Sequence, residues 1–319
     1  MRTVDVVVPC YNYAKYLEIC VRSILDQPDV AVRVLIIDDC STDESEVVGR
    51  RLAADDSRVH YRRHDRNIGH IATYNEGLLG WATADYCLLI SADDLLTPGA
   101  LSRAVRVLDE YPSVGMCCGA QIVFSEVPDL DTPAPAGEAV RIARGADFWA
   151  ETCRTGQNAV ATPTAVVRTG VQQAAGGYRS ELPHSGDLEM WLRIAARADV
   201  SFLNSYQACK RMHGSNMQVA YLKHLLGDLL ERHKAFESAL AECQDRLPRP
   251  DRFRQEARRS LALEALWAAS SELDHRRQDS AAECLAASRS IDPSVVTSVP
   301  WWRVQAKRAI TMVTGRKAS

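Results

Sequence analysis

Two adjacent aspartates, Asp93 and Asp94, are the residues of this sequence best suited by type and position to do chemistry. They follow an apolar run, Tyr86–Ile90, which predicts a buried strand because polar and apolar residues do not alternate in it. Ligands of open α/β sheets bind beyond the carboxyl ends of such strands. Adjacent carboxylates raise each other's proton affinity unless a cation offsets their repulsion, and a hard divalent ion that faces a phosphate does so. The pair therefore predicts a metal-bridged phosphoester site. The alternative is a polar turn before a helix that Thr97 caps.

Similar units of apolar strand, polar loop and amphipathic helix fill the rest of the first 110 residues. Apolar runs at Val4–Val8 and Val32–Ile37 predict two buried strands, and the second ends in another acidic pair, at 38–39. A third short strand is expected at Val59–Arg63, before a helix at about 70–81. Strands that alternate with helices predict right-handed crossovers and a mostly parallel sheet. The loops after successive strands should then converge on one edge of an α/β fold.

The pattern changes near residue 220. Before that point strands and helices alternate, whereas from Tyr221 onward the apolar spacing is helical and includes a second helical stretch at 253–288. We therefore expect an α/β catalytic domain over residues 1–220. A helical domain or tail is expected over residues 221–319.

The composition is that of an ordinary globular protein. The 319 residues are 46% hydrophobic, and a formal net charge of -3 with a pI near 6.3 argues against wholesale nucleic-acid binding. The 10 cysteines are scattered without Cys-x-x-Cys spacing, which favours free thiols in a reducing cytosol. The opening MRTVDVVVPC is too short for a signal peptide, and no segment reaches the roughly 18 uninterrupted apolar residues of a membrane span. A cytoplasmic protein is expected.

Several short motifs follow one another along the first 216 residues. In chain order they contain Pro9, Tyr11 and Asn12, then Asp38, Asp39, Ser41 and Asp43, then Asn67 and Gly69, then Ser91, Asp93 and Asp94, and last Gly176, Gly177, Tyr178, Asp187, Trp191, Leu192 and Arg193. Taken together, their order and spacing resemble family 2 inverting glycosyltransferases of the GT-A fold. The resemblance implies a nucleotide-diphospho-sugar transferase fold, with a mostly parallel central sheet flanked by helices and followed here by a C-terminal helical extension.

The resemblance also implies that the nucleotide of an activated sugar lies over the first two loops. Asp39 would accept a hydrogen bond from the base, and an acceptor-only group suits the imide N–H of uracil or thymine. Tyr11 would pack on the base, and Arg66 would face the diphosphate. The alternatives are a turn residue for Asp39 and a solvated side chain for Arg66. The implied donor site comprises Pro9, Tyr11, Asn12, Asp39, Arg66, Asn67 and Asp93.

By the same resemblance, Asp94 with Asp93 would bind Mn²⁺ or Mg²⁺ that bridges the diphosphate and stabilises the leaving nucleotide. His213 lies in a segment similar to the Arg-x-His-x-x-Asn end of the family's catalytic part and would approach the metal. The alternative for His213 is a structural role. Ser91 stands where the commoner family pattern has an acidic residue, so no carboxylate is present for the ribose contact assigned there. His64 has no metal-ligand spacing.

Asp187 would be the general base implied by the family pattern. It would take the proton from the acceptor hydroxyl as that oxygen attacks the anomeric carbon opposite the leaving diphosphate. One such displacement inverts the anomeric centre. The alternative is a helix cap, because a carboxylate at a helix N-terminus complements the free N–H groups and the dipole. Gly186 stands where the commoner pattern has Glu, so Asp187 lacks its usual acidic neighbour.

These motifs predict a metal-dependent inverting glycosyltransferase. The donor would be a nucleotide-diphosphate sugar, a UDP-sugar first and a dTDP-sugar second, and the acceptor a hydroxyl of a carbohydrate, a lipid-linked saccharide or a small molecule. One alternative is a nucleotidyltransferase that makes an activated sugar, but the chain lacks the Gly-rich, Lys-bearing phosphate loop that would favour it. The other alternative is a nucleotide-sugar-binding protein without catalysis.

Residues 299–319 contain basic side chains and no acidic one. Trp301 and Trp302 precede Arg303 and, further on, Ile310, a pattern that suits an interfacial helix on anionic lipid. The alternative is a tail helix whose tryptophans pack on the helical domain. The lipid alternative predicts peripheral contact at the inner membrane face and a membrane-borne acceptor.

Overall fold

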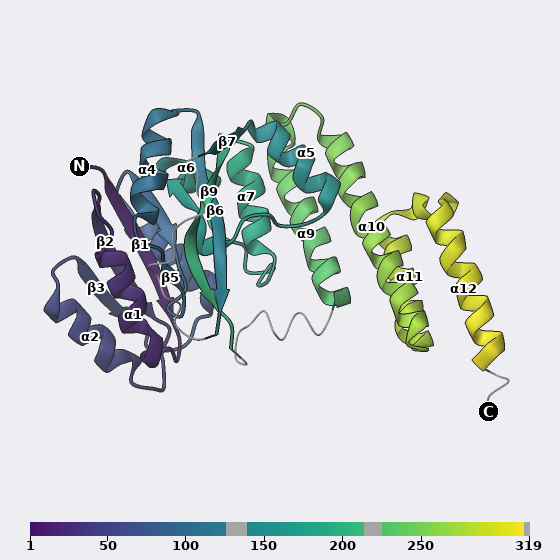
Figure 1. Cartoon of the computed structure of the whole chain (residues 1–319), viewed down its shortest axis with the longest axis horizontal. Helices are drawn as coiled ribbons and strands as arrows, with labels where there is room; N and C mark the ends of the chain where they lie inside the picture. Colours follow the sequence, from purple (N-terminus) through teal and green to yellow (C-terminus); the bar gives the residue numbers. More distant parts are fainter. Residues whose placement is uncertain (126–138, 214–224, 316–319) are drawn as a thin grey trace. The chain divides into compact units, whose positions relative to one another are not determined.

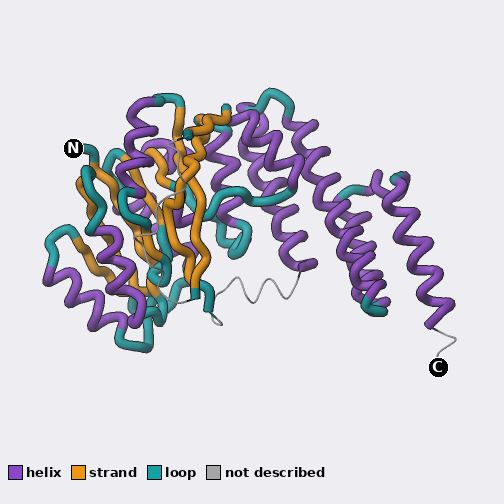
Figure 2. The backbone as a smooth tube through the Cα atoms, viewed as in Figure 1, coloured by secondary structure: helices purple, strands orange, loops and turns teal. Residues whose placement is uncertain are grey.

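The computed structural model describes residues 1–125, 139–213 and 225–315 (Figure 1). Strands and helices alternate in the first two of these segments, whereas the third contains helices and no strand (Figure 2). The expected boundary at residue 220 lies outside the described residues.

The chain forms two compact units, and each is made of two segments that are separate in the sequence. The first unit comprises residues 1–148 and 158–214 and contains the sheet. The second comprises residues 149–157 and 215–319. The short segment 149–157 therefore packs with the C-terminal helices although it precedes the last strands in sequence.

Four parallel strands form the first half of the sheet. β1 (Thr3–Cys10) pairs with β2 (Ala31–Asp38) on one side and with β4 (Tyr86–Leu89) on the other, and β3 (Val59–Arg63) pairs with β2. β1, β2 and β4 are buried along most of their length because helices cover both faces of the sheet. The expected parallel arrangement is confirmed for this half.

The second half of the sheet is mixed, and the strand order is β3-β2-β1-β4-β8-β6-β9-β5 with β7 also on β9. β8 (Val166–Arg168) is antiparallel to both β4 and β6 (Val114–Phe124), whereas β6 is parallel to β9 (Asp199–Arg211). β5 (Leu95–Leu96) and β7 (Val140–Ala143) are antiparallel to β9. The sheet is thus less parallel than the sequence predicted, because several short strands pair without the crossover helix that a parallel neighbour needs.

One face of the sheet is covered by α1 (Ala14–Leu25), α2 (Ser45–Asp55) and α4 (Ala100–Glu110), which share an apolar core with β1, β2 and β4 (Figure 1). α4 begins at Ala100 and not at Pro98, and Thr97 does not cap it, because Thr97 Oγ1 donates to the Tyr206 carbonyl at 2.7 Å. α1 buries the residues that its spacing predicted, which are Leu17, Cys20, Val21 and Ile24.

The opposite face carries α3 (His70–Asn75), η1 (Glu76–Trp81), α6 (Thr169–Ala175) and α7 (Gly186–Ala195). The expected helix at 70–81 is confirmed, but after Asn75 it continues as the π-helix η1. Gly77 lies directly on β1, since a Cβ at that position would lie 2.4 Å from Val7 Cγ1. This close approach holds the helix near the carboxyl ends of the strands.

The described part of the second unit is helical, and no described helix is long and apolar enough to cross a membrane. The expected helical stretch at 253–288 contains two helices, because the chain turns at Arg276, whose φ is +59°. The ring of Trp149 stacks on Phe253 with centroids 5.9 Å apart, which joins the segment 149–157 to this unit. The elements are the end of α5 (Gly145–Thr155), α9 (Leu225–Cys243), η3 (Gln244–Arg246), α10 (Pro250–Asp274), α11 (Gln278–Ile291), η4 (Pro293–Thr297) and α12 (Val299–Gly315).

Candidate functional site

The carboxyl ends of the first four strands lie at one edge of the sheet. Cys10 pairs with Asp38, and Asp38 pairs with Arg63, so the loops after β1, β2 and β3 leave the sheet together. β4 ends at the same edge, because Leu89 pairs with Val7 of β1. The loops therefore converge as the alternation of strands and helices predicted.

Hydrogen bonds tie the loop after β1 to the loop after β2. Asn12 lies in the left-handed region with a φ of +59°; its Oδ1 accepts from Thr42 N at 2.8 Å, and its own N–H donates to Ser41 Oγ at 2.9 Å. These bonds turn the chain so that Tyr11 is 46% exposed. Pro9 is the penultimate residue of β1 and is half-buried. The paired loops thus present an aromatic ring at the surface of the site.

Asp38 is a structural residue of this edge. Its carboxylate is wholly buried and accepts from Ser41 N at 2.7 Å, from the Tyr61 hydroxyl at 2.7 Å and from Arg63 Nη1 at 2.8 Å. Burial alone would raise the pKa of Asp38, but these hydrogen bonds outweigh it and lower the pKa. Asp38 is therefore held ionised by the protein itself.

Asp39 binds the loop after β3. Its Oδ1 accepts from His64 Nδ1 and from Ile68 N, both at 2.8 Å, and its Oδ2 accepts from Gly69 N at 2.9 Å. Gly69 has a φ of +87°, a conformation that a residue with a Cβ rarely adopts. A carboxylate oxygen has two lone pairs, so within the described part of the chain Oδ2 keeps one acceptor position. Two further donor-site candidates of the same loop, Arg66 and Asn67, are exposed.

Asp93 and Asp94 lie in the turn between β4 and β5. Asp93 Oδ1 accepts from the Ser91 hydroxyl, and Asp93 Oδ2 lies 3.0 Å from His213 Nε2. Asp94 Oδ1 accepts from Arg211 N at 3.0 Å. Burial, followed by the charge of Asp93, raises the pKa of Asp94 to about 8. The pair thus holds negative charge that the surrounding protein compensates incompletely.

The end of β9 brings His213 to this turn. Leu95 of β5 pairs with Cys209 of β9, so the residues that follow Cys209 pass over the two aspartates. The His213 ring stacks on Tyr16 with centroids 5.5 Å apart and meets Tyr13 edge-on at 5.9 Å. His213 therefore has both a packing role and an acidic neighbour.

These residues fit a divalent cation as part of its ligand set. In the described part of the chain no group of three or more His, Cys, Asp or Glu side chains is assembled for a metal. Mg²⁺ and similar ions in phosphate-transfer sites bind one or two protein carboxylates together with phosphate oxygens of the substrate. Asp93 and Asp94 could provide the two carboxylates. The raised pKa of Asp94 indicates that its negative charge is unfavourable in this buried position, and a bound cation would reduce that repulsion.

Asp187 lies in the first turn of α7 and is half-buried. Its Oδ1 accepts from Leu188 N at 2.7 Å, and its Oδ2 lies 3.4 Å from Thr162 Oγ1, which is long for a hydroxyl hydrogen bond. Burial raises the pKa of Asp187, while the Leu188 N–H and the charges of His184 and Lys210 lower it in part. The result is a carboxylate of increased basicity with one oxygen weakly engaged.

The phenol of Tyr74 on α3 is affected electrostatically by three of these acidic residues. Burial raises the pKa of its phenol, and the charges of Asp187, Asp93 and Asp94 raise it further, so all three carboxylates lie within electrostatic range of Tyr74. The sequence analysis did not single out Tyr74, although it stands on the helix directly after the Asn-x-Gly motif. Lys210 and Thr162 were missed as well because they come from β9 and the 3-10 turn η2 (Thr162–Thr164), far from the motifs in sequence.

The Gly-Gly-Tyr loop is fixed from two sides. Asn75 Nδ2 donates to the Tyr178 carbonyl at 2.8 Å, and Tyr178 N donates back to Asn75 Oδ1 at 2.6 Å. A Cβ at Gly177 would lie 2.8 Å from Asn75 Cγ, so this approach needs glycine. Arg193 of α7 donates to the carbonyls of Ala175 and Gly177. The arginine of the Trp-Leu-Arg motif therefore holds the loop in place.

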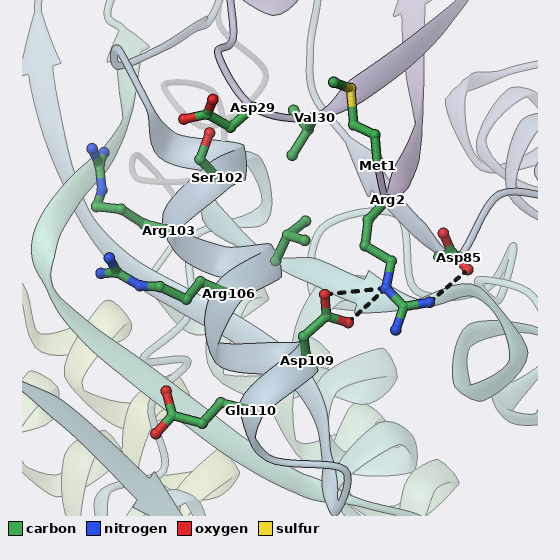
Figure 3. Close-up of a pocket in the computed structure, with 11 residues that line it drawn as sticks. Met1, Arg2, Asp29, Val30, Asp85, Ser102, Arg103, Arg106, Asp109 and Glu110 are labelled. Atoms are coloured by element: carbon green, nitrogen blue, oxygen red, sulfur yellow. Dashed lines mark hydrogen bonds and ion pairs between the residues drawn. The ribbon is translucent and has the colours of Figure 1, made fainter.

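A separate pocket of about 940 Å³ lies at the opposite edge of the sheet, where β1 and β4 begin (Figure 3). Arg2 spans its wall and forms ion pairs with Asp109 at 2.9 Å and with Asp85 at 3.6 Å. None of the site residues predicted from the sequence lines this pocket. Its lining mixes acidic and basic side chains and indicates no particular ligand.

A family model and several known proteins match this chain in sequence. The model of glycosyl transferase family 2 matches residues 5–170. An uncharacterised protein of Mycobacterium tuberculosis is 26% identical over 241 residues, which cover 72% of this chain and 73% of that protein. The putative teichuronic acid biosynthesis glycosyltransferase TuaG of Bacillus subtilis is 27% identical over 128 residues, 40% of this chain and 50% of TuaG.

Solved structures share the fold. S. aureus TarS 1–349, solved with UDP, superposes with a TM-score of 0.61 at 16% identity and covers 93% of this chain and 92% of its own. The mannosyltransferase PcManGT from Pyrobaculum calidifontis, solved with GDP-Man and Mn²⁺, gives a TM-score of 0.56 at 18% identity over 98% of this chain and 86% of its own. At such identities the likeness concerns the GT-A architecture of the sheet, its helices and the helical C-terminal region.

Proposed function

Since this chain belongs to glycosyl transferase family 2, we propose that it is an inverting glycosyltransferase that uses a UDP-sugar and a divalent cation. The family and the fold make it a glycosyltransferase with a nucleotide-sugar donor. The finer proposal rests chiefly on Tyr74, which lies within electrostatic range of both Asp187 and the Asp93–Asp94 pair. This supports placing the general base and the diphosphate side of the donor in one site.

Asp39 supports a pyrimidine nucleotide as the donor. Its Oδ2 keeps an acceptor position for the imide N–H of uracil or thymine, and the exposed ring of Tyr11 is available for stacking on the base. We propose a UDP-sugar first and a dTDP-sugar second, and the TarS neighbour, which was solved with UDP, is consistent with this order. Because the other neighbour was solved with GDP-Man, the direct test is calorimetry of UDP against GDP in the presence of Mn²⁺. UDP is expected to bind more tightly, and GDP binding of equal or greater strength would contradict the assignment.

Asp94 and Asp93 would hold Mn²⁺ or Mg²⁺, with His213 beside them. When bound, the cation would supply positive charge that stabilises the diphosphate of the leaving nucleotide. Within the chain, the Arg211 N–H and the Ser91 hydroxyl fix the orientation of the two carboxylates, and burial keeps water from screening them. Ser91 thus has a role here that an acidic residue at its position would not fill.

Asp187 would act as the general base. Its raised pKa makes it a better proton acceptor than an ordinary carboxylate, and the Leu188 N–H engages Oδ1 while Oδ2 makes only the long contact to Thr162. The acceptor oxygen forms a bond to the anomeric carbon as the bond from that carbon to the diphosphate oxygen breaks. The hydroxyl proton passes to Asp187, and one displacement inverts the centre.

The decisive experiment measures UDP release by the full chain with a panel of UDP-sugars, Mn²⁺ and candidate saccharide acceptors, and determines the anomeric configuration of the product by NMR. Inverted product is expected. Retained configuration would exclude the single displacement. Nucleotide-sugar binding without release under all conditions would favour the non-catalytic alternative. Synthesis of a nucleotide sugar from a sugar phosphate and a nucleoside triphosphate would favour the nucleotidyltransferase.

Contact with anionic lipid at the inner membrane face is proposed for α12, which would keep this cytoplasmic enzyme near a membrane-borne acceptor. Trp302 is 64% exposed and Ile310 63% exposed on this helix, whereas Val304 is buried. Lys307 bonds to Asp274 of α10 at 2.7 Å, so the helix packs by one face and keeps apolar groups on the other. Co-sedimentation with anionic vesicles should fall in Trp302→Ala and stay unchanged in the control Trp267→Ala; equal pelleting of all three proteins would leave α12 a structural helix.

A further inference from the structure

His64 is a histidine held between two carboxylates, and the reaction outlined above gives it no role. Its Nδ1 lies 2.8 Å from Asp39 Oδ1, and its Nε2 lies 2.9 Å from Glu76 Oε2. The ring follows β3, Asp39 follows β2 and Glu76 begins η1, so three separate elements meet at it. Only 10% of the His64 side chain is exposed.

These contacts favour the protonated form of His64. An ionised carboxylate oxygen accepts and does not donate, so both contacts are satisfied at once when each ring nitrogen carries a hydrogen, as in the imidazolium. Burial lowers the pKa of His64, but the hydrogen bonds and charges of Asp39 and Glu76 outweigh it, and the net pKa is raised. Arg62 Nη1 contacts the other oxygen of Glu76 at 2.5 Å, which keeps Glu76 ionised.

We propose that His64 is a positioning residue that orients Asp39 to recognise the pyrimidine base of the donor. His64 and the Ile68 N–H occupy both lone pairs of Asp39 Oδ1, and the Gly69 N–H occupies one of Oδ2. Among the described residues these three donors leave the carboxylate one acceptor position, and they fix its plane. This inference rests on the proposed function, since it assumes that Asp39 contacts the base.

Loss of the His64 proton changes this arrangement in a definite direction. A neutral imidazole has one N–H, so one of its two carboxylate partners must then face a ring lone pair. Affinity for the base is therefore highest below the folded-state pKa of His64 and falls as the pH rises through it. The charged groups that face His64 or adjoin it are Asp39, Glu76, Arg62, Arg63, Asp65 and Arg66.

The test compares His64→Gln with a matched control, His60→Gln, in the full chain. His60 lies on β3, the strand that ends just before His64; it is exposed and packs edge-on against Trp81 at 5.8 Å. At pH 6.5 with Mn²⁺, UDP affinity should fall about tenfold in His64→Gln, while turnover at saturating donor stays within about twofold of the wild type. His60→Gln should match the wild type in both. Unchanged UDP affinity in His64→Gln would overturn the positioning role.

The pH profile separates positioning from a merely structural effect. It is measured with uridine and without metal, so that neither a phosphate nor Asp94 contributes to the titration. Wild-type affinity should fall as the pH rises, Glu76→Gln should move the midpoint to lower pH, and His64→Gln should show no such midpoint. An identical midpoint in all three proteins would overturn the inference. If the wild type bound neither uridine nor UDP, the proposed donor itself would fail, which is a different result from UDP binding that ignores His64.

Discussion

The carboxylates of the proposed donor half of the site and those of the proposed reaction half have opposite environments. Asp38, under the nucleotide loops, accepts three hydrogen bonds and has a lowered pKa. Asp94 is buried and Asp187 half-buried; among the described residues each accepts fewer hydrogen bonds than Asp38, and both have a raised pKa. The protein thus compensates the charge of Asp38 well and the charges of Asp94 and Asp187 incompletely, which suits the cation and the proton that the proposed mechanism brings to them.

Such a division follows from what each half must do. A group that recognises a base by a hydrogen bond needs one fixed ionisation state, which local donors provide. A general base or a cation ligand must gain a positive partner during the reaction cycle, so complete compensation by the protein would remove its function. Four predictions test whether the division is real, in order of expected effect.

Asp187→Asn should lower turnover by about two to four orders of magnitude, the usual scale for loss of a general base, and leave UDP affinity near that of the wild type. The amide keeps the size of the side chain but accepts no proton. Initial rates and calorimetry of UDP measure the two quantities, and Glu181→Gln, an exposed change in the preceding loop, is the control. Near-native turnover would reduce Asp187 to a helix-capping residue.

Asp94→Asn should weaken UDP binding in the presence of Mn²⁺ by roughly tenfold to a hundredfold and lower turnover as well, because the cation would touch both the protein and the diphosphate. Calorimetry with Mn²⁺ and with a chelator measures the effect. Asp55→Asn at the exposed end of α2 serves as the charge-matched control. Activity of Asp94→Asn that persists at the wild-type level in chelator would remove the cation from the mechanism.

Stability should respond to Asp38 and Asp94 in opposite directions. Asp38→Asn should lower the free energy of unfolding by about 2 kcal/mol at pH 8, because it weakens charge-assisted hydrogen bonds. The folded-state pKa of Asp94 lies above its unfolded value, so in the metal-free protein its charge destabilises the fold increasingly as the pH rises from about 4 through about 8. Asp94→Asn should therefore melt higher than the wild type at pH 8 and equally near pH 4. Melting curves of the three proteins at both pH values decide this, and a lower melting point for Asp94→Asn at pH 8 would contradict the comparison.

Tyr11→Ala should lower UDP affinity by about tenfold or less, within the range for loss of one aromatic ring that stacks on a base. Because the residue is 46% exposed, the melting temperature should stay within about 1 °C of that of the wild type. Calorimetry of UDP binding and thermal melting of Tyr11→Ala and Tyr11→Phe measure the two predicted effects. UDP affinity that is the same in both variants and in the wild type would show that the base does not stack on this ring.

Much of the first unit could be predicted from the sequence because β1, β2 and β4 are mostly apolar runs. The run at Val32–Ile37 became β2, and the acidic residues after it lie at the edge where the loops meet. In the first unit, whether a segment forms a strand or a helix depends on the spacing of its apolar residues, which a single sequence reveals. The GT-A architecture followed from the order of the motifs and agrees with the solved relatives.

What the sequence did not predict depends on contacts between distant segments. His64 acquires its role only because Glu76 and Asp39 reach it from other elements, and Lys210 comes near Asp187 only through the pairing of β9. The turn at Arg276 has no Gly or Pro to mark it. Local spacing contains no information on such approaches.

The helix over residues 70–81 carries three consecutive side chains that serve three different parts of the site. Tyr74 lies near the reactive carboxylates, Asn75 holds the Tyr178 loop through two hydrogen bonds, and Glu76 holds His64. Because one short segment bears all three, a substitution that shifts it is expected to change UDP affinity and turnover together. Coupling between the two substrates could therefore be sought first at this segment, by measuring UDP affinity with and without an acceptor.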